Sequence, residues 1–243
     1  FWKRRTSMTS IQEFSVSRTT ITSRICQSVL LICVFWMLFI ASGDNKASQG
    51  KIIDICIFIV LASMWNLLTG FSGLISIGQQ AFVGLGAYSL IVLANGVGIN
   101  IYLAVIPSAI IVAVISIPLG LVAFRLRGGY FAIGTWVIAE VVRLIVKNNQ
   151  SSVIGAGTGT SLEVPESLKS GRYQVTTFIA ISVVVVSVVF VYLFLRSRFG
   201  LALQSVRDNE TGARSLGVDS YRVRFVVYIV ASFFTSLAAA TYY

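Results

Sequence analysis

The sequence predicts an all-α integral membrane protein, a polytopic helical bundle with about seven spans and a cytoplasmic N-terminus. Hydrophobic residues make up 56% of the 243 positions and charged residues only 12%, and the mean hydropathy is +0.85, all far from the composition of a soluble domain. Apolar runs of membrane-spanning length recur along the chain, and none alternates as a β-barrel strand does. The spans are therefore expected to be helices, which satisfy their backbone hydrogen bonds internally.

Seven apolar runs define the expected spans. They lie at about 25–41, 52–68, 72–94, 101–124, 130–146, 175–195 and from 223 to the end. We expect residues 1–24 to form a basic cytoplasmic segment and residues 25–243 to form one membrane domain. Two connections are long, an outer loop at about 147–174 and an inner loop at about 196–222. Because the chain begins at Phe1 without Met and stops inside an apolar run, we expect it to be part of a longer protein.

Lysine and arginine residues orient these spans. With the N-terminus inside, the inner segments carry 13 basic residues and the outer segments carry five, while Arg143 falls within a span. This asymmetry supports the cytoplasmic N-terminus and the count of seven together, because a missed span would mix the two groups. Anionic lipid headgroups at the cytoplasmic face are a sufficient partner for the net charge of +10, and no nucleic acid is implied.

Residues that could carry catalysis or bind a metal are scarce. The chain has no histidine, and Cys26, Cys33 and Cys56 lie within apolar runs at spacings that match neither a disulfide framework nor a zinc site. Buried cysteine behaves as a small hydrophobe, so we interpret all three as packing residues. The sequence shows no carboxylate pair and no nucleophile with a base, which predicts that the chain is not an enzyme and uses no cofactor or metal.

A set of polar residues, called the polar stripe here, runs from the end of the second expected span into the third. Its members are Asn66, Thr69, Ser72, Ser76, Gln79 and Gln80. They are three or four residues apart, so on one continuous helix they would share a face. Such a face either packs against other helices or lines a water-filled path, and the amides of Asn66, Gln79 and Gln80 favour the path. The glycines among these residues also allow a break or a re-entrant bend.

Several motifs resemble those of the branched-chain amino acid ABC transporter permeases, in the LivM-like branch of the LivH/LivM family. Residues 73–88, GLISIGQQAFVGLGAY, resemble the family signature G-x-x-S-x-G-H-x-A-F-x-G-x-G-A-Y. Further matches follow in the family's order at 125–133, 139–144, 155–162 and 196–218, so the resemblance covers about residues 60 to 243. The chain departs from the pattern at Gln79, where the family commonly has His, at Gln80, where it has Ala, and at Gly212 within an Ala-rich helix.

The resemblance implies the permease subunit of an ATP-driven ABC importer for branched-chain or other hydrophobic amino acids, multi-pass in a bacterial inner membrane. It also implies the partners, which are two ABC ATP-binding subunits, a second LivH-like permease, a periplasmic solute-binding protein and membrane lipid. Within the same class, a urea or short-amide importer is the alternative. From other classes, an ATP-independent channel or secondary transporter and a non-transporting assembly subunit stay open.

Glu140 and Arg143 share a face of the fifth expected span, three residues apart. An ion pair between them would offset part of the cost of placing charge in the membrane. Two interpretations stay open, a structural brace and a charged wall of the substrate path. A zwitterionic amino acid offers one charged group to each partner, which makes the second interpretation attractive.

The inner loop combines apolar and charged residues in a short amphipathic helical pattern, broken near Asn209 and Gly212 and stopped at Gly217. A basic helix resting on anionic lipid is one interpretation, although Asp208 and Glu210 add acid where lipid favours base. The resemblance implies a coupling helix that docks into the ATP-binding subunit, with Arg207, Asp208, Glu210 and Gly217 as the contact residues. We expect Gly217 to end that helix in a left-handed turn.

Overall fold

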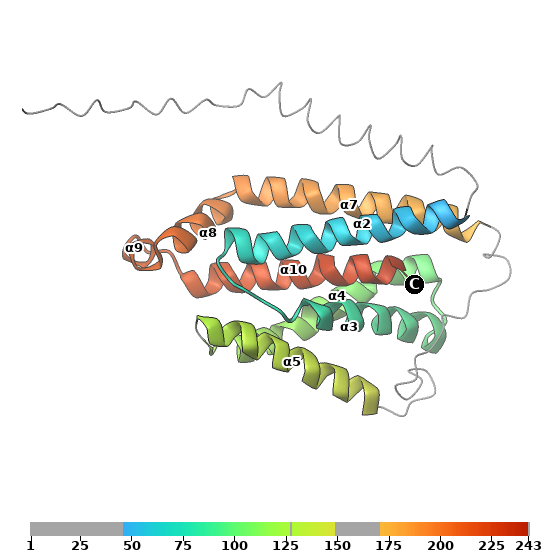
Figure 1. Ribbon diagram of the computed structural model, residues 1–243, viewed down its shortest axis with the longest axis horizontal. Coiled ribbons are helices and arrows are strands. Elements are labelled where there is room, and N and C mark those ends of the chain that lie inside the picture. The colour runs from blue at the N-terminus through green and yellow to red at the C-terminus, as the bar shows by residue number, and fades with distance from the viewer. Residues whose placement is uncertain (1–45, 127, 149–170, 243) are drawn as a thin grey trace, which may run out of the picture. The chain divides into compact units, whose positions relative to one another are not determined.

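The computed structural model describes residues 46–126, 128–148 and 171–242, and all regular elements in these ranges are helical (Figure 1). In chain order the elements are α2 (Lys46–Asn66), the π-helical turn η1 (Leu67–Phe71), α3 (Gln79–Ile91), the π-helical turn η2 (Val92–Gly96), α4 (Ile101–Ala123), α5 (Gly129–Asn148), α7 (Arg172–Arg196), α8 (Arg198–Asp208), α9 (Glu210–Ser215) and α10 (Ser220–Tyr242). The predicted all-α class is confirmed.

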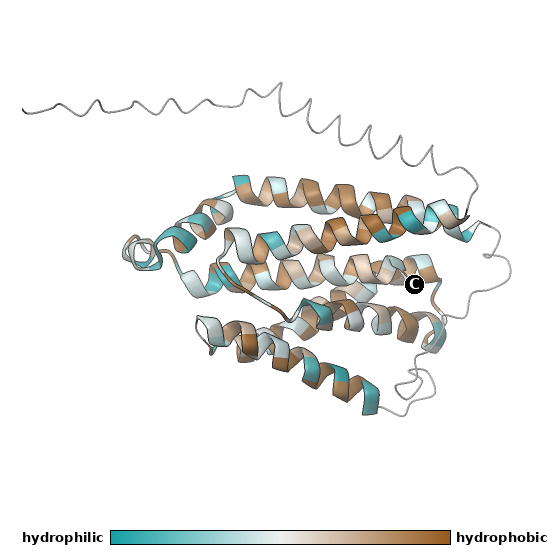
Figure 2. Cartoon of the chain, in the orientation of Figure 1, coloured by the Kyte–Doolittle hydropathy of each residue, from teal (hydrophilic) through white to brown (hydrophobic). Residues whose placement is uncertain are grey.

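Helix α10 forms the centre of the bundle and packs against α2, α3, α4 and α7 (Figure 1). Two thirds of its most apolar 18-residue window is buried (67%), against 22% for α7. Small residues make this possible, since they let helices approach closely. At one such contact, a Cβ added to Gly86 of α3 would lie 2.6 Å from the carbonyl oxygen of Ser236 in α10. Figure 2 shows the matching contrast, with strong hydrophobic colour along α7 and paler colour along α10.

The remaining helices surround this centre. Helix α2 packs against α7, α3 packs against α4, and α5 lies at the edge of the bundle in contact with α3 and α4 (Figure 1). An aromatic cluster around Phe124 joins the end of α4 to the starts of α5 and α10. The rings of Phe131, Tyr221, Phe225 and Tyr228 all lie within 5.7 Å of the Phe124 ring, centroid to centroid.

Five helices in the described part of the chain are long and apolar enough to cross a membrane. They are Ala47–Phe71, Ile101–Ala123, Gly129–Asn148, Arg172–Arg196 and Ser220–Tyr242. They match the second, fourth, fifth, sixth and seventh expected spans. The segment 1–24 and the span 25–41 lie outside the described residues, so the total of seven and the cytoplasmic N-terminus stay predictions. Most of the outer loop, including its glycine-rich stretch 155–162, also lies outside them.

The third expected span, 72–94, is not one continuous helix. Residues 72–78, called the break here, are non-helical, and α3 begins only at Gln79. Gly73 adopts φ +69°, and the backbone N–H of Leu74 donates to the carbonyl of Leu68 at 3.0 Å, which closes the end of η1. Glycine adopts this left-handed conformation without the strain that a Cβ would cause. The bend that the glycines allow is therefore present, and the expectation of a single helical face for the polar stripe was wrong.

The inner loop folds into α8 and α9. Ser197 caps α8 through Gly200, and Asn209 caps α9 by accepting a hydrogen bond from the N–H of Gly212 at 2.9 Å. The expected interruption is thus at Asn209, whereas Gly212 lies inside α9. Gly217 follows with φ +83°, and this confirms the left-handed turn predicted there.

Candidate functional site

Hydrogen bonds tie the backbone of the break to α2, η1 and α5. The indole Nε1 of Trp65 in α2 donates to the carbonyl of Ser76 at 3.3 Å, and Thr69 Oγ1 in η1 donates to the carbonyl of Leu74 at 3.3 Å. The N–H of Ile77 donates to Thr135 Oγ1 of α5 at 3.2 Å. These bonds replace part of the helical hydrogen bonding that residues 72–78 lack.

Four members of the polar stripe lie around the break and bond or pack locally. Ser72 and Ser76 are buried, with the Ser72 hydroxyl donating to the Leu68 carbonyl and the Ser76 hydroxyl accepting from the Gly78 N–H at 3.4 Å. The side-chain oxygen of Asn66 occupies the space where a Cβ on Gly70 would lie. With the Thr69 bond, these contacts support a packing role for Asn66, Thr69, Ser72 and Ser76.

Gln79 and Gln80 begin α3 and have different surroundings. The amide Nε2 of Gln79 is buried and has no hydrogen-bond partner in the described ranges. A buried amide without a partner is costly, so this donor is available to a group outside the described residues. Gln80 is exposed and lines a pocket between α3 and α5.

This α3/α5 pocket has a volume of about 520 Å³ and brings three of the predicted substrate-path residues together. Its lining comprises Gln80, Ala81, Gly84, Leu85 and Tyr88 of α3 with Ala139, Glu140, Val142, Arg143, Val146 and Lys147 of α5. Tyr88 and Lys147 were missed by the sequence analysis. Helical spacing could have found both, because Tyr88 is two turns beyond Gln80 and Lys147 is one turn beyond Arg143.

Glu140 and Arg143 form the ion pair that their spacing predicts. Arg143 Nε donates to Glu140 Oε2 at 2.8 Å, and Arg143 Nη2 approaches Oε1 at 2.5 Å, so the contact is bidentate. The side chain of Arg143 is nevertheless 59% exposed and that of Glu140 47% exposed. Charged groups within a membrane span generally face protein or water rather than lipid, so this exposed pair is suited to contact with another protein or with water.

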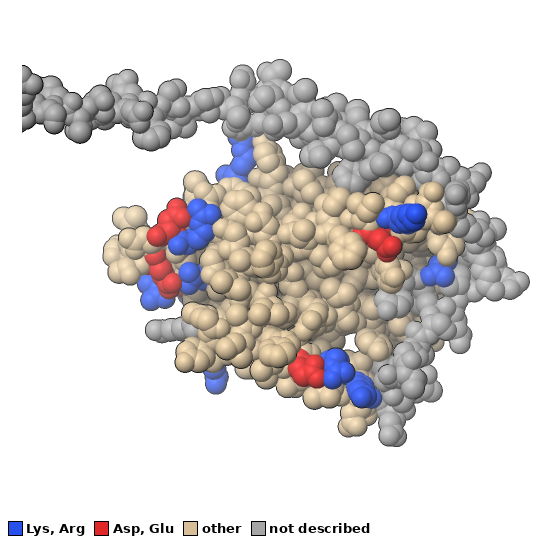
Figure 3. All heavy atoms as spheres, viewed as in Figure 1, with Lys and Arg blue, Asp and Glu red and all other residues tan. Residues whose placement is uncertain are grey.

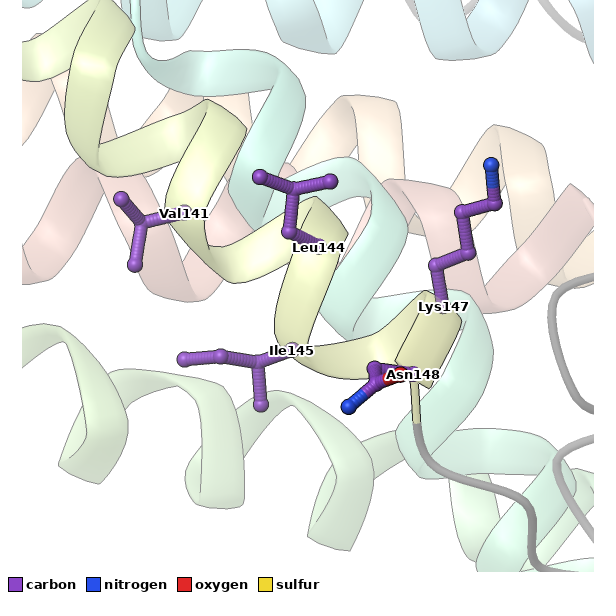
Figure 4. Close-up of a pocket in the computed structure, with 5 residues that line it drawn as sticks. All are labelled: Val141, Leu144, Ile145, Lys147 and Asn148. Carbon is purple, nitrogen blue, oxygen red and sulfur yellow. The ribbon is translucent and has the colours of Figure 1, made fainter.

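A second hollow lies further along α5 (Figure 4). It has a volume of about 570 Å³ and is lined by Val141, Leu144, Ile145, Lys147 and Asn148. The close-up shows the three apolar side chains projecting from the helix before its end, where Lys147 and Asn148 lie. Beside the ion pair, α5 therefore presents apolar side chains that suit contact with another helix.

The inner loop carries a second group of charges, around Glu210. Glu210 pairs with Arg214 of α9 at 2.6 Å and with Arg224 of α10 at 2.8 Å. Arg207 pairs with the neighbouring Asp208 at 2.9 Å. Figure 3 shows acidic and basic side chains gathered at the end of the bundle formed by α8 and α9. Three of the four predicted coupling residues thus lie in ion pairs, and the fourth, Gly217, is exposed.

Two arginines of the inner loop and α10 also reach the end of η1 and the start of the break. Arg207 Nη1 donates to the carbonyl of Gly70 at 2.9 Å, and Arg224 Nε donates to the carbonyl of Ser72 at 3.3 Å. A groove of about 740 Å³ lies alongside, and its lining includes residues 73–75 of the break together with Glu210 and Arg224. Arg224 was not among the predicted site residues, because in the sequence it counts only as one of the basic residues of the inner segments. No sequence signal identifies a backbone carbonyl as its partner.

A polytopic helical bundle with irregular backbone beside a partly charged pocket is typical of membrane proteins that move solutes. The chain belongs to the family described as branched-chain amino acid transport system / permease component, whose model matches residues 50–243. This agrees with the family resemblance of the motifs.

Three curated relatives are also named as permease proteins of branched-chain amino acid transport. The chain is 25% identical, over 88% of its length, to the high-affinity branched-chain amino acid transport system permease protein LivM of Salmonella typhimurium, and 24% identical to the LivM protein of Escherichia coli. It covers 56% of each of these two proteins, so it spans about half of their length. A probable LivM of Methanocaldococcus jannaschii is 28% identical over 60% of the chain, and the match covers 43% of the length of that protein. No solved structure matches the chain significantly.

Proposed function

We propose that the chain is the permease subunit of an ATP-driven ABC importer for branched-chain or other hydrophobic amino acids, in a bacterial inner membrane. The family and the LivM relatives support this proposal. The structural observation that carries it is the α3/α5 pocket, which Gln80 lines together with the ion pair of Glu140 and Arg143. Its volume of about 520 Å³ falls within the range of small-molecule sites.

The pocket offers a complementary group for each part of an amino acid. The Glu140 carboxylate suits the solute ammonium, and the Arg143 guanidinium suits the solute carboxylate. Leu85, Val142 and Val146 supply apolar surface for a branched side chain. Because the two charges already satisfy each other in a bidentate contact, a zwitterion would replace that contact with two of its own.

A urea or short-amide importer is the second candidate, and the unpartnered Nε2 of Gln79 supports it. This donor could bond the carbonyl oxygen of a neutral amide as readily as a carboxylate oxygen. A neutral solute, however, would leave the charges of Glu140 and Arg143 without a function in transport. The ion pair therefore favours the zwitterionic solute.

A second, LivH-like permease is proposed to cover the exposed side of α5. That side carries an ion pair that lipid would not solvate, next to apolar side chains such as Val141, Leu144 and Ile145. A pathway between two permeases would place the α3/α5 pocket at their boundary. The strongly apolar α7 is proposed to face lipid.

Two ABC ATP-binding subunits are proposed as partners, and the inner loop of this chain is proposed to dock one of them. The turn after α9 exposes 85% of Leu216, next to Gly217 and the charges of Arg207, Asp208 and Glu210. An exposed leucine surrounded by charged residues suits the apolar centre and polar rim of a protein interface. ATP would be hydrolysed by those partners, while a periplasmic solute-binding protein would deliver the solute from outside.

The test uses the full-length protein with its partners. Mild-detergent affinity purification from the native host, with mass spectrometry, should recover ABC ATP-binding subunits and a sister permease. Reconstituted into liposomes with the solute-binding protein, this complex should take up labelled leucine only when ATP is supplied, and urea should not compete. Recovery of the protein alone, with solute flux in liposomes that lack ATP, would instead establish a channel or secondary transporter.

A further inference from the structure

Arg224 lies where the inner loop meets the break. Its guanidinium donates from Nε to the carbonyl of Ser72 at 3.3 Å and from Nη1 to Glu210 Oε2 at 2.8 Å. The side chain is only 19% exposed, whereas Arg214, the other partner of Glu210, is 58% exposed. One partly buried cation therefore joins α9, α10 and the start of the break.

The backbone carbonyls at the end of η1 are favourable hydrogen-bond acceptors for arginine. The last carbonyls of a helical segment lack partners within the helix and carry its partial negative charge, so cations are favourable there. Arg207 bonds the Gly70 carbonyl and Arg224 bonds the Ser72 carbonyl, two residues further on. Both arginines also pair with an acid in or next to the inner loop, Asp208 and Glu210, respectively.

The break continues from this contact to the α3/α5 pocket. After Ser72 the chain is non-helical up to Gly78, with Ile77 bonded to Thr135 of α5, and Gln79 and Gln80 follow directly. A segment without a helical hydrogen-bond ladder can change its backbone angles at lower cost than the helices on either side. A displacement of its first residue can therefore alter the position of Gln80 relative to Glu140.

We propose that Arg224 is a positioning residue that couples the inner loop to the break. By holding Glu210 and the Ser72 carbonyl together, it makes a movement of α9 pull on the break and so change the α3/α5 pocket. This inference rests on the proposed function, because the movement of α9 is the one imposed by the ATP-binding subunits. The proposal assigns the coupling between the inner loop and the pocket to Arg224, a residue outside the surface proposed to dock the ATP-binding subunit.

The experiment compares Arg224→Gln with Arg224→Lys in the assembled complex, and Arg222→Gln is the matched control. Arg222 is two residues earlier on α10, is 84% exposed and pairs with Asp219 rather than with Glu210. The readouts are recovery of the ATP-binding subunits, the ATPase rate, and the solute taken up per ATP hydrolysed. We expect Arg224→Gln to retain the subunits and the ATPase activity but to lower uptake per ATP about tenfold, since a charged hydrogen bond is lost.

The lysine variant and the control show whether the effect depends on the charge and the hydrogen bonds of Arg224. Arg224→Lys keeps the charge and one donor, so it should restore part of the uptake per ATP, while Arg222→Gln should match the wild type. An Arg224→Gln complex with the wild-type ratio of uptake to hydrolysis would overturn the proposal. Equal losses of ATPase recovery and of uptake would also overturn it, because they would assign Arg224 to docking or folding.

A spin label on the break tests the proposal in complexes with and without Arg224→Gln. Ile75 is 58% exposed and lines the same groove as Glu210 and Arg224, so Ile75→Cys can carry a spin label once Cys26, Cys33 and Cys56 are replaced by serine. ATP binding should change the label spectrum, and Arg224→Gln should abolish the change. An unchanged spectrum in a complex that imports solute would refute the coupling role, whereas a complex that imports without ATP would refute the proposed function itself.

Discussion

Gly78 lies directly against Thr135, so the break and α5 are in van der Waals contact. A Cβ added at Gly78 would be 2.6 Å from the Thr135 carbonyl oxygen, and the neighbouring Ile77 N–H bonds the Thr135 hydroxyl at 3.2 Å. Backbone cannot move aside as the end of a flexible side chain can. The contact thus shows how closely the break approaches the helix that carries Glu140 and Arg143.

Gly78→Ala is expected to separate the break from α5. The added methyl group would force a backbone shift, with a cost of about 1–3 kcal/mol as in other overpacked sites. Thermal unfolding of the purified complex should show the loss of stability, and uptake should fall with it. Gly50→Ala in α2 is the matched control, because nothing lies within 4 Å of its added Cβ. A Gly78→Ala complex as stable as this control would contradict the close contact.

Thr135→Val tests the hydrogen bond without changing the volume much. The variant leaves the Ile77 N–H without its acceptor, which should cost about 1–3 kcal/mol if the group stays shielded from water. Thr135→Ser keeps the hydroxyl and should retain most of the stability and uptake. Hydrogen exchange of the Ile77 amide, measured by mass spectrometry of the complex, should be faster in the valine variant only.

The sequence predicted the helices well and the site only in part. Continuous apolar runs are long enough to identify spans by themselves, and the pair of Glu140 and Arg143 follows from spacing within one unbroken helix. The polar stripe failed as a single face because helical spacing holds only while the helix continues, and Gly73 ends it. The contacts of Arg224 could not be predicted, since a backbone carbonyl such as that of Ser72 leaves no trace in the residue types.

Variants of the ion pair in α5 distinguish between two roles, a structural brace and a charged wall of the substrate path. Glu140→Gln should lower leucine uptake at least about tenfold, because a charged partner of the solute is lost. The reversed pair, Glu140→Arg with Arg143→Glu, restores a brace but presents the charges in the opposite order, so uptake should stay low while stability recovers. Asp54→Asn, an exposed carboxylate of α2 outside the pocket, is the control. Full recovery of uptake in the reversed pair would assign the residues to bracing alone.

Gly217→Ala should uncouple the inner loop without unfolding the spans. Gly217 has φ +83°, a conformation that costs a residue with a Cβ about 1–2 kcal/mol, so alanine would alter the turn that exposes Leu216. Combined with Glu210→Gln, it should leave ATP hydrolysis in place and remove its link to uptake. Normal uptake per ATP in this double variant would remove the coupling role of the inner loop.

Gln79→Leu is expected to move stability and transport in opposite directions. Leucine removes the buried Nε2 that lacks a partner in the described residues, so the purified complex should be as stable as the wild type or more stable by about 1–3 kcal/mol. Uptake should fall, because that amide is a donor at the start of α3 that the described residues leave available. Thermal unfolding and leucine uptake of the same preparation decide between the roles. If the variant lost stability and assembly while the remaining complex transported normally, Gln79 would be a packing residue.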